Sequence, residues 1–312
     1  MKLVFISKSD KKAAWRDSLQ AQLPDLEFLI WPDEISDADK ASIDYALVWR
    51  PPTGVLKTFP NLKAILSLGA GVDGVLVDPE LPTHIPVCRL VDRCLTQGMT
   101  EYVLYHVIRQ HRRFGDYEKM TAAGEWDVFT QEDARRRGVG ILGLGELGRD
   151  AAEKLVALDY DVASWSRSPK DVAGVTSFHG ADGLDGFLAR TQILICLLPL
   201  TDETQGIINA EHLAKLPKGA YVINCARGAH VVDDDLLAAL DSGHIAGATL
   251  DVFNEEPLPK DHAYWTHPKV IMTPHAASLT VPHSAAEYVA ENIRLIEAGE
   301  TPMNIVDLTT GY

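Results

Sequence analysis

Cysteine is scarce in this chain, which has four in 312 residues: Cys88, Cys94, Cys196 and Cys225. No two of them form a Cys-x-x-Cys pair, so the sequence argues against a disulfide framework and against a zinc site. Long apolar runs are also missing, because the longest, from Ile193 to Leu200, is far too short to cross a bilayer. The apolar run in Met1 to Ser7 is likewise too short for a signal peptide. We therefore expect a protein of the reducing cytoplasm, with no metal site.

Positive charge is in deficit. The chain has 29 Lys and Arg residues against 44 Asp and Glu, for a formal net charge of -15. This balance argues against nucleic acid or an anionic membrane as a partner. It also means that a phosphorylated cofactor or an acidic substrate would be repelled by the overall field. Any such ligand needs local Arg and Lys side chains.

Short apolar strands alternate with amphipathic helices along most of the sequence. This alternation predicts parallel, doubly wound α/β sheets, and 312 residues are enough for two domains. In the first part we expect strands at 3–7, 27–30, 45–49, 64–68 and 87–90, and a helix at 12–23. A long helix is predicted over 96–117, and later strands at 192–197, 220–225, 246–251 and 270–273, with helices at 209–216 and 233–242. A final helix over 282–298 could pack back on the first part.

A glycine-rich turn follows the apolar strand from Val139 to Leu142. Gly143, Gly145 and Gly148 form Gly-x-Gly-x-x-Gly, and a helix over 146–158 and a second strand over 161–165 follow. Gly143 permits the tight turn, Gly145 lets a pyrophosphate approach the backbone, and Gly148 lets the helix lie close to the strand. The pattern alone also fits a structural turn, but its strand–helix–strand context favours a dinucleotide site. The predicted contacts at this turn are Gly143, Gly145, Glu146, Leu147 and Gly148.

The end of the second strand indicates which dinucleotide is bound. NAD sites usually have a carboxylate there, whereas this chain has Ser166, Arg167, Ser168 and Lys170. Hydroxyl, guanidinium and ammonium groups would bind a 2′-phosphate that a carboxylate would repel. We expect NADPH, with NADH as the weaker alternative; the other interpretation is a solvated loop.

Three later segments place polar side chains just after predicted strands. Arg227 follows Asn224-Cys225-Ala226, Glu256 follows Leu250 to Glu255, and His275 follows Thr273-Pro274. Here the chain resembles the D-2-hydroxyacid dehydrogenases, most closely their glyoxylate/hydroxypyruvate reductase A subgroup. The resemblance covers nearly the whole chain and includes Tyr45 to Trp49, Leu68 to Asp73 and Leu250 to Asn254.

The resemblance implies that Arg227 binds the substrate carboxylate, that His275 is the acid and base, and that Glu256 pairs with His275. The chemistry also suits these residue types, because a planar guanidinium holds a carboxylate in a fork and an imidazolium donates a proton near neutral pH. Taken singly, Arg227 could instead be a cap or a salt-bridge partner, Glu256 a solvated loop carboxylate, and His275 an ordinary polar residue after a strand. Glu255 is the rival of Glu256, which we prefer because the family places its Glu directly before Pro.

Further contacts are implied on both parts of the chain. Backbone N–H groups of Ala70 and Gly71 would bind the carboxylate, although a plain tight turn is the alternative. Trp49 and Arg50 would set specificity, although Trp49 could be only a core residue. Additional cofactor contacts are expected at Pro199, Thr204, Cys225, Ala226 and Asp251. Pro199 could instead be a simple strand-ending proline, and Cys225 a buried, inert thiol. The chain departs from the family at Ala276-Ala277, where paired glycines are frequent.

The expected protein is a two-domain reductase. Residues 1–97 with 283–312 would form a flavodoxin-like substrate domain, and residues 98–282 a Rossmann dinucleotide-binding domain, with a cleft between them that closes over the ligands. The expected reactions convert glyoxylate to glycolate and hydroxypyruvate to D-glycerate. The alternatives are another D-2-hydroxyacid dehydrogenase or a non-catalytic dinucleotide-sensing protein. The family implies a homodimer, and the polar segment 122–137 with Trp126 could be either a surface loop or an arm on a second subunit.

Overall fold

The computed structural model describes residues 1–311, which form two compact units. The first unit combines Met1–Leu95 with the segment from Leu279 onward, and the second is Thr96–Ser278. The domain boundaries predicted from the sequence, after residues 97 and 282, lie a few residues later than these unit boundaries. The assignment of the substrate to the first unit and of the dinucleotide to the second stays a prediction.

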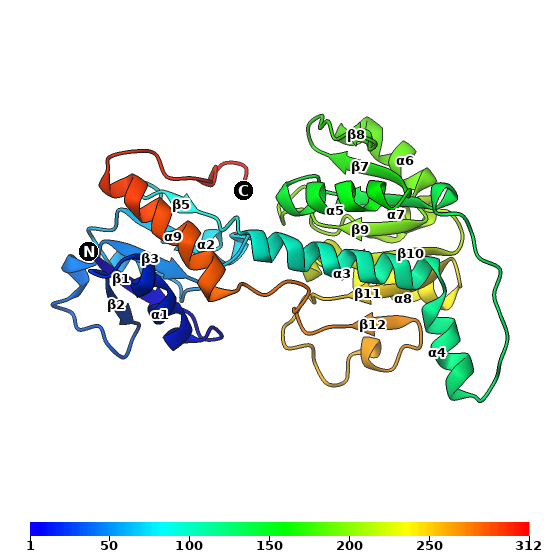
Figure 1. Ribbon diagram of the computed structural model, residues 1–312, viewed down its shortest axis with the longest axis horizontal. Coiled ribbons are helices and arrows are strands. Elements are labelled where there is room, and N and C mark those ends of the chain that lie inside the picture. The colour runs from blue at the N-terminus through cyan, green and yellow to red at the C-terminus, as the bar shows by residue number, and fades with distance from the viewer. Residues whose placement is uncertain (312) are drawn as a thin grey trace. The chain divides into compact units, whose positions relative to one another are not determined.

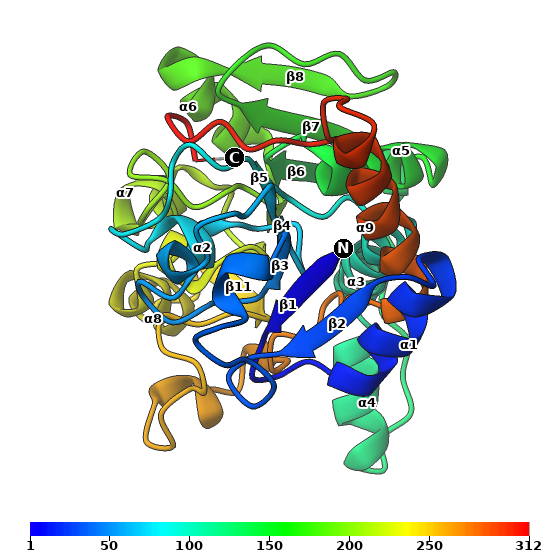
Figure 2. The same ribbon diagram turned by 90° about the vertical axis from the view of Figure 1, so that its left-hand side faces the viewer.

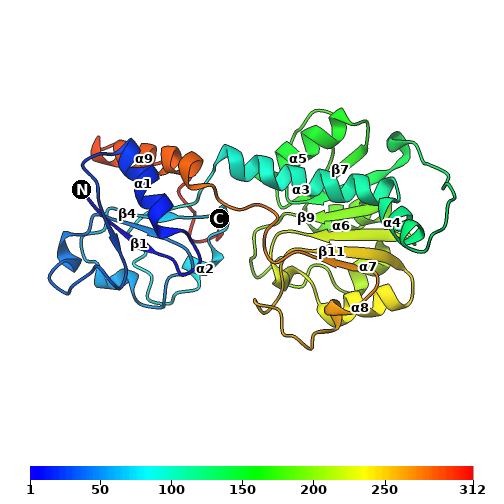
Figure 3. The same cartoon turned by 60° about the horizontal axis from the view of Figure 1, so that its bottom comes forward.

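The first unit is built on a five-stranded sheet in the order β2-β1-β3-β4-β5, with every neighbouring pair parallel. Its strands are β1 (Lys2–Ile6), β2 (Glu27–Ile30), β3 (Tyr45–Val48), β4 (Ala64–Ser67) and β5 (Val87–Cys88). Tyr45 and Leu47 point to one face, where α1 (Lys12–Gln22) and α9 (Pro282–Glu297) pack side by side (Figures 1 and 3). Ala46 and Val48 point to the other face, which η2 (Leu56–Thr58), α2 (Asp73–Leu76) and neighbouring loops cover, while η1 (Lys40–Ser42) lies in the connection before β3. The unbroken apolar strands of the sequence are thus explained by burial on both faces.

The second unit contains a seven-stranded sheet in the order β12-β11-β10-β9-β6-β7-β8, again with every neighbouring pair parallel. Its strands are β6 (Gly138–Leu142), β7 (Asp161–Ser166), β8 (Thr176–His179), β9 (Ile193–Cys196), β10 (Ala220–Asn224), β11 (Ile245–Leu250) and β12 (Val270–Met272). Strand order reverses at β6, since β7 and β8 lie on one side of it and β9 to β12 on the other. Figure 2 shows β6, β7 and β8 in succession within this sheet. In open α/β sheets, ligands bind beyond the carboxyl ends of the strands at such a reversal.

Helices cover both faces of this second sheet. One face packs against α3 (Arg93–His111) and α5 (Glu146–Ala157). The other packs against α6 (Gly180–Arg190), α7 (Ala210–Lys215) and α8 (Asp233–Asp241). Two parallel, doubly wound α/β sheets were predicted, and this fold class is confirmed.

The predicted single helix over 96–117 is wrong. The chain forms α3 to His111 and then a separate α4 (Phe114–Ala122), with Arg113 between them at a left-handed φ of 59°. Arg113 makes side-chain contacts at this break, donating to Asp116 at 2.8 Å and lying 3.7 Å from the centre of the Phe129 ring. No residue of α4 is buried. Packing against the sheet therefore does not hold residues 114–122 in a straight continuation of α3.

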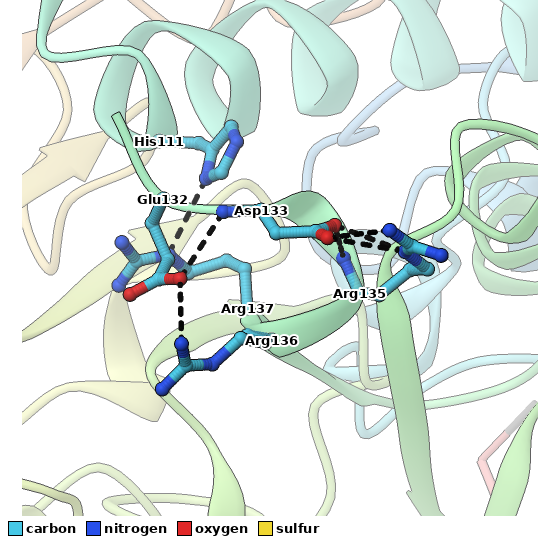
Figure 4. Close-up of polar contacts among 6 residues, drawn as sticks. All are labelled: His111, Glu132, Asp133, Arg135, Arg136 and Arg137. Carbon is cyan, nitrogen blue, oxygen red and sulfur yellow. Dashed lines mark hydrogen bonds and ion pairs between the residues drawn. The ribbon is translucent and has the colours of Figure 1, made fainter. Parts of the chain in front are cut away.

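The connection from α4 to β6 includes η3 (Ala134–Arg136), and Figure 4 shows the polar contacts that its side chains make with one another and with His111. The Asp133 carboxylate accepts from the backbone N–H of Arg135 at 3.0 Å and also contacts its guanidinium. Arg137 Nε lies 3.4 Å from Nδ1 of His111 on α3. Burial, together with the Arg137 and Arg112 cations, holds the pKa of His111 below its ordinary value. Earlier in the same connection, Trp126 is 99% exposed.

Within residues 1–311, none of the helices combines the length and the apolar character that a membrane crossing requires.

Candidate active site

His275 and Glu256 contact each other at one edge of the second sheet. His275 follows β12 and Glu256 follows β11, and these parallel neighbours bring both residues to the same carboxyl edge. Nδ1 of His275 lies 2.9 Å from Oε2 of Glu256, whose other oxygen accepts from the backbone N–H of Phe253 at 3.2 Å. The carboxylate in contact is therefore Glu256 rather than its rival Glu255, which is exposed. With Nδ1 held in this way, Nε2 is the ring nitrogen left for proton exchange with a ligand.

The backbone at His275 is held in an uncommon conformation. Its φ of 52° lies in the left-handed region, which non-glycine residues adopt rarely and mostly where neighbouring groups fix them. Asp251, which is 1% exposed, supplies that support. Its carbonyl accepts from the His275 N–H at 2.7 Å, and its carboxylate accepts from the N–H groups of Ala276 at 2.8 Å and Ala277 at 3.0 Å. Asp251 thus orients the loop that presents His275, a role that the sequence analysis missed.

Arg227 follows β10, the strand next to β11, and so lies at the same sheet edge. Asn224 fixes its backbone by donating to the Arg227 carbonyl at 2.8 Å. The next residue, Gly228, packs so closely on the loop after β11 that a Cβ there would lie 1.9 Å from the carbonyl carbon of Phe253. The loops carrying Arg227 and Glu256 therefore touch at their backbones.

Cys225 and Ala226 precede Arg227 and are buried. Burial raises the pKa of the Cys225 thiol well above its ordinary value, and this thiol lies 3.7 Å from the carbonyl oxygen of Cys196. Such a thiol is not poised for nucleophilic chemistry. The contact of Cys225 and Ala226 with a cofactor stays a prediction.

The three glycines of the turn after β6 have three different structural environments. Gly143 has a φ of +96°, so it makes the turn that other residues resist. A Cβ on Gly148 would lie 2.0 Å from the carbonyl oxygen of Gly143, so this glycine allows α5 to approach the turn. A Cβ on Gly145 would meet no described atom within 4 Å, and the protein's own packing does not require glycine there. Without a Cβ, this exposed position leaves space in which a ligand can approach the backbone. Such an open approach is what a pyrophosphate needs.

The first turn of α5 also suits that ligand. Gly145 is the residue before the helix, and Glu146 and Leu147 are its first two residues. The N–H groups at a helix start have no partner within the helix and carry partial positive charge. They can therefore bind an anionic group at this turn.

The end of β7 has the composition expected for a phosphate contact. Ser166 is buried, and among residues 1–311 its hydroxyl has no hydrogen-bond partner. Arg167, Ser168 and Lys170 follow it and are exposed. After β9, the Thr204 hydroxyl donates to the Pro199 carbonyl at 2.8 Å and closes a loop at the same sheet edge. These residues fit a phosphorylated dinucleotide, although their contacts with it stay predictions.

Four predicted substrate residues lie in the first unit. Trp49 and Arg50 follow β3, and Ala70 and Gly71 lie just beyond β4, its parallel neighbour. The Arg50 guanidinium is 5.9 Å from the centre of the Trp49 ring, and Arg50 has a left-handed φ of 44°. Trp49 also packs against the apolar core, as its alternative interpretation expected. The N–H groups of Ala70 and Gly71 have no acceptor among the described residues, so they are available to a ligand.

Comparison with known proteins agrees with this geometry. A family model described as the D-isomer specific 2-hydroxyacid dehydrogenase, NAD binding domain, matches residues 104–277. A relative from Serratia proteamaculans, named glyoxylate/hydroxypyruvate reductase A, is 44% identical over 317 residues that cover both chains fully. A D-isomer specific 2-hydroxyacid dehydrogenase from Xanthobacter autotrophicus, solved with NADPH and MES, is 46% identical, with a TM-score of 0.96 over 100% of this chain and 99% of that one. An NADPH-dependent glyoxylate/hydroxypyruvate reductase from Sinorhizobium meliloti, solved with NADP and sulfate, is 37% identical, with a TM-score of 0.92 and full coverage of both chains.

Proposed function

The chain belongs to the D-isomer specific 2-hydroxyacid dehydrogenase family, and from this premise we propose that it is a reductase of small 2-oxo acids that uses NADPH. Its reactions are the reduction of glyoxylate to glycolate and of hydroxypyruvate to D-glycerate. The observation that carries this proposal is the contact between His275 and Glu256 at the sheet edge to which Arg227 also belongs. The homologues that bear the reductase name are 41% to 44% identical over the whole chain.

The three side chains divide the chemistry between them. The Arg227 guanidinium binds the substrate carboxylate in a two-pronged contact and orients the neighbouring carbonyl. NADPH supplies the hydride that the carbonyl carbon accepts. His275 gives the proton on Nε2 to the carbonyl oxygen as negative charge develops there. Glu256 holds the ring through Nδ1 and stabilises its protonated form.

The proposed cofactor site is the reversal point of the second sheet. Gly143, Gly145 and Gly148 with the first turn of α5 hold the pyrophosphate. The hydroxyl and cationic groups after β7 hold the 2′-phosphate, so NADPH is preferred and NADH is the weaker substrate. Two family members solved with NADPH or NADP support this choice.

The proposed substrate contacts in the first unit are Ala70 and Gly71, through backbone N–H groups that have no acceptor among residues 1–311. Trp49 and Arg50 are proposed to select among 2-oxo acids by the size and charge of the group on the carbonyl carbon. Arg50 suits this role because its guanidinium and the Trp49 ring lie beside each other.

A single assay tests the proposal. NADPH absorbance is followed with glyoxylate, hydroxypyruvate and pyruvate in turn, and the first two should be reduced faster. Pyruvate as the best substrate would indicate a D-2-hydroxyacid dehydrogenase of different range. Binding of NADPH without turnover of any of the three would replace the reductase by a dinucleotide-sensing protein.

We also propose a homodimer, formed through the second unit. Trp126 and Val128 are 99% and 79% exposed on the connection after α4. Nearby, Tyr105, Phe114 and Tyr117 line a hollow of about 630 Å³ on α3 and α4. Apolar side chains this exposed are typical of surfaces that a partner covers. We propose a cytoplasmic location, which suits the four free cysteines.

A further inference from the structure

His230 is a fully buried histidine that the mechanism leaves without a task. It is 0% exposed and lies at the end of the short helix η4 (Gly228–His230), three residues after Arg227. Its backbone is tied down, because its N–H donates to the Arg227 carbonyl at 3.2 Å and its carbonyl accepts from Ile208 at 2.8 Å. A buried imidazole needs partners for both ring nitrogens, and these partners indicate what it does.

The two ring nitrogens face the two loops of the proposed site. Nδ1 lies 3.2 Å from the backbone N–H nitrogen of Arg227 and 3.1 Å from the Arg227 carbonyl oxygen. Nε2 lies 3.3 Å from the carbonyl oxygen of Pro199. One ring therefore bridges the loop of the proposed carboxylate-binding residue and the loop of two proposed cofactor residues, Pro199 and Thr204.

The surrounding hydrogen bonds determine which nitrogen of the His230 ring carries the proton. The Arg227 carbonyl already accepts from Asn224 Nδ2 at 2.8 Å and from the His230 backbone, so it has little need of a further donor. The Arg227 N–H can only donate, which makes Nδ1 its acceptor and places the ring proton on Nε2. Nε2–H then donates to Pro199, whose carbonyl also accepts from the Thr204 hydroxyl at 2.8 Å.

We propose that His230 is a positioning residue that fixes Arg227 and the Pro199–Thr204 loop relative to each other. This inference rests on the proposed function of those two loops. Hydride transfer requires that the substrate and the cofactor are held at a fixed distance and orientation. Small displacements of the aligned groups lower the rate strongly. A hydrogen-bonded ring with no access to water is a rigid link between the loops.

Three substitutions separate the two halves of the link. His230→Asn places an amide where Nδ1 lies, so it retains the Arg227 contact and loses the Pro199 contact. His230→Gln reaches the place of Nε2, so it retains the Pro199 contact and loses the Arg227 contact. His230→Phe keeps the ring and loses both. The matched control is His244→Phe, which removes an imidazole contact of 2.9 Å with the Leu213 carbonyl in the same unit but away from both loops.

Each variant is assayed for the KM and kcat of glyoxylate, for the NADPH dissociation constant by fluorescence titration, and for its melting temperature. His230→Gln should raise the KM for glyoxylate by about five- to tenfold while NADPH binds within about twofold of wild type, as the loss of one buried hydrogen bond implies. His230→Asn should show the opposite split, and His230→Phe should change both constants. The control should leave both constants within about twofold of wild type, since it breaks a comparable bond elsewhere.

Two results would overturn the proposal. One is a lower melting temperature for all His230 variants with unchanged KM and NADPH affinity, which would make the ring a structural element only. The other is an equal change of both constants in the Asn and Gln variants. Wild-type protein that reduces no 2-oxo acid would refute the proposed function instead, and the NADPH affinities of the Asn and Gln variants would then decide the role of His230 alone.

Discussion

Among single residues, His275 depends on two carboxylates with separate tasks. Glu256 contacts its imidazole, whereas Asp251 holds the backbone of the loop that carries it. The resemblance to the family implied the first task, and the predicted strands that Glu256 and His275 follow are consistent with it. The sequence could not predict the second, since the Asp251 carboxylate binds N–H groups whose positions are set only by the folded loop. It also gave no sign of His230, because the Pro199 carbonyl and the Cys196 side chain reach this ring only in the folded protein.

Replacing the proposed acid is the most direct test at the residue scale. We expect His275→Asn to lower kcat by about 100- to 10,000-fold, the usual contribution of a positioned acid or base, with little change in NADPH binding. Asparagine is chosen because it tolerates the left-handed φ that His275 adopts, so the loop keeps its shape. Steady-state kinetics measures the loss, and His262→Asn serves as control. Near-wild-type turnover would show that another group transfers the proton.

Cofactor preference depends on another single residue. Arg167→Ala should raise the KM for NADPH about tenfold and leave the KM for NADH nearly unchanged, because only NADPH carries the 2′-phosphate that the guanidinium would pair with. Both constants come from initial rates with saturating glyoxylate. An equal loss with the two cofactors would refute the phosphate contact.

His106 on α3 makes stability depend on pH. Burial and the nearby Arg109 cation lower the pKa of its imidazole from an ordinary 6.5 to about 4. Between these values the unfolded chain binds the proton more readily than the folded one, so the free energy of unfolding falls as pH falls from 6.5 towards 4. Between pH 7 and pH 5 this loss amounts to about 2 kcal/mol, and His106→Asn should remove it. Urea denaturation at pH 7 and pH 5 measures it, and equal pH dependence of the two proteins would contradict the assignment.

Whole elements were predictable where apolar periodicity is strong. The central strands of both sheets are buried on both faces, and their apolar runs are plain in the sequence. The strand β8 and the helix α6 were missed. The residues of β8 are mostly exposed, so they show no apolar run, and α6 contains Gly183 and Gly186, which lower helix propensity but allow the Phe178 side chain to pack closely. The break between α3 and α4 was missed because it depends on the contacts of Arg113.

The junction of β6 and α5 allows folding and binding to be tested separately. Gly148→Ala should destabilise the protein by several kcal/mol, on the order of other overpacked sites, because its Cβ would lie 2.0 Å from the Gly143 carbonyl. Gly145→Ala should leave the melting temperature unchanged, since its Cβ would meet no described atom, yet weaken NADPH binding. Thermal denaturation and fluorescence titration distinguish the two effects. Unchanged NADPH affinity in Gly145→Ala would argue against a pyrophosphate at this turn.

For the molecule as a whole, the net charge of -15 opposes the binding of anions. At the proposed site, local positive charge offsets this repulsion. It comes from Arg167, Lys170 and Arg227 after strand ends and from the helix N–H groups at the turn. Composition therefore only argued against nucleic acid and anionic membranes as partners, and motifs were needed to indicate the ligands. The family was recognisable because those motifs are spread over most of the chain, and the comparisons confirm it.

The proposed assembly predicts a change in mass. Trp126→Asp should convert a dimer into a monomer in multi-angle light scattering, because it places a charge among side chains that the partner would bury. The control is Val77→Asp, which charges a residue that is 78% exposed in the first unit and should leave the mass unchanged. A wild-type protein that is monomeric at micromolar concentration would remove the homodimer from the proposal.

The packing of α9 against α1 has a consequence for synthesis on the ribosome. The five strands of the first unit and α1 emerge early, but α9, the second helix on that face of the sheet, is translated only after all of the second unit. During that interval only α1 covers this face, so the apolar surface that α9 later buries stays exposed and aggregation can begin there. The second unit is continuous in sequence, so it can complete its core as soon as it has been translated. The first unit can do so only after α9 has followed.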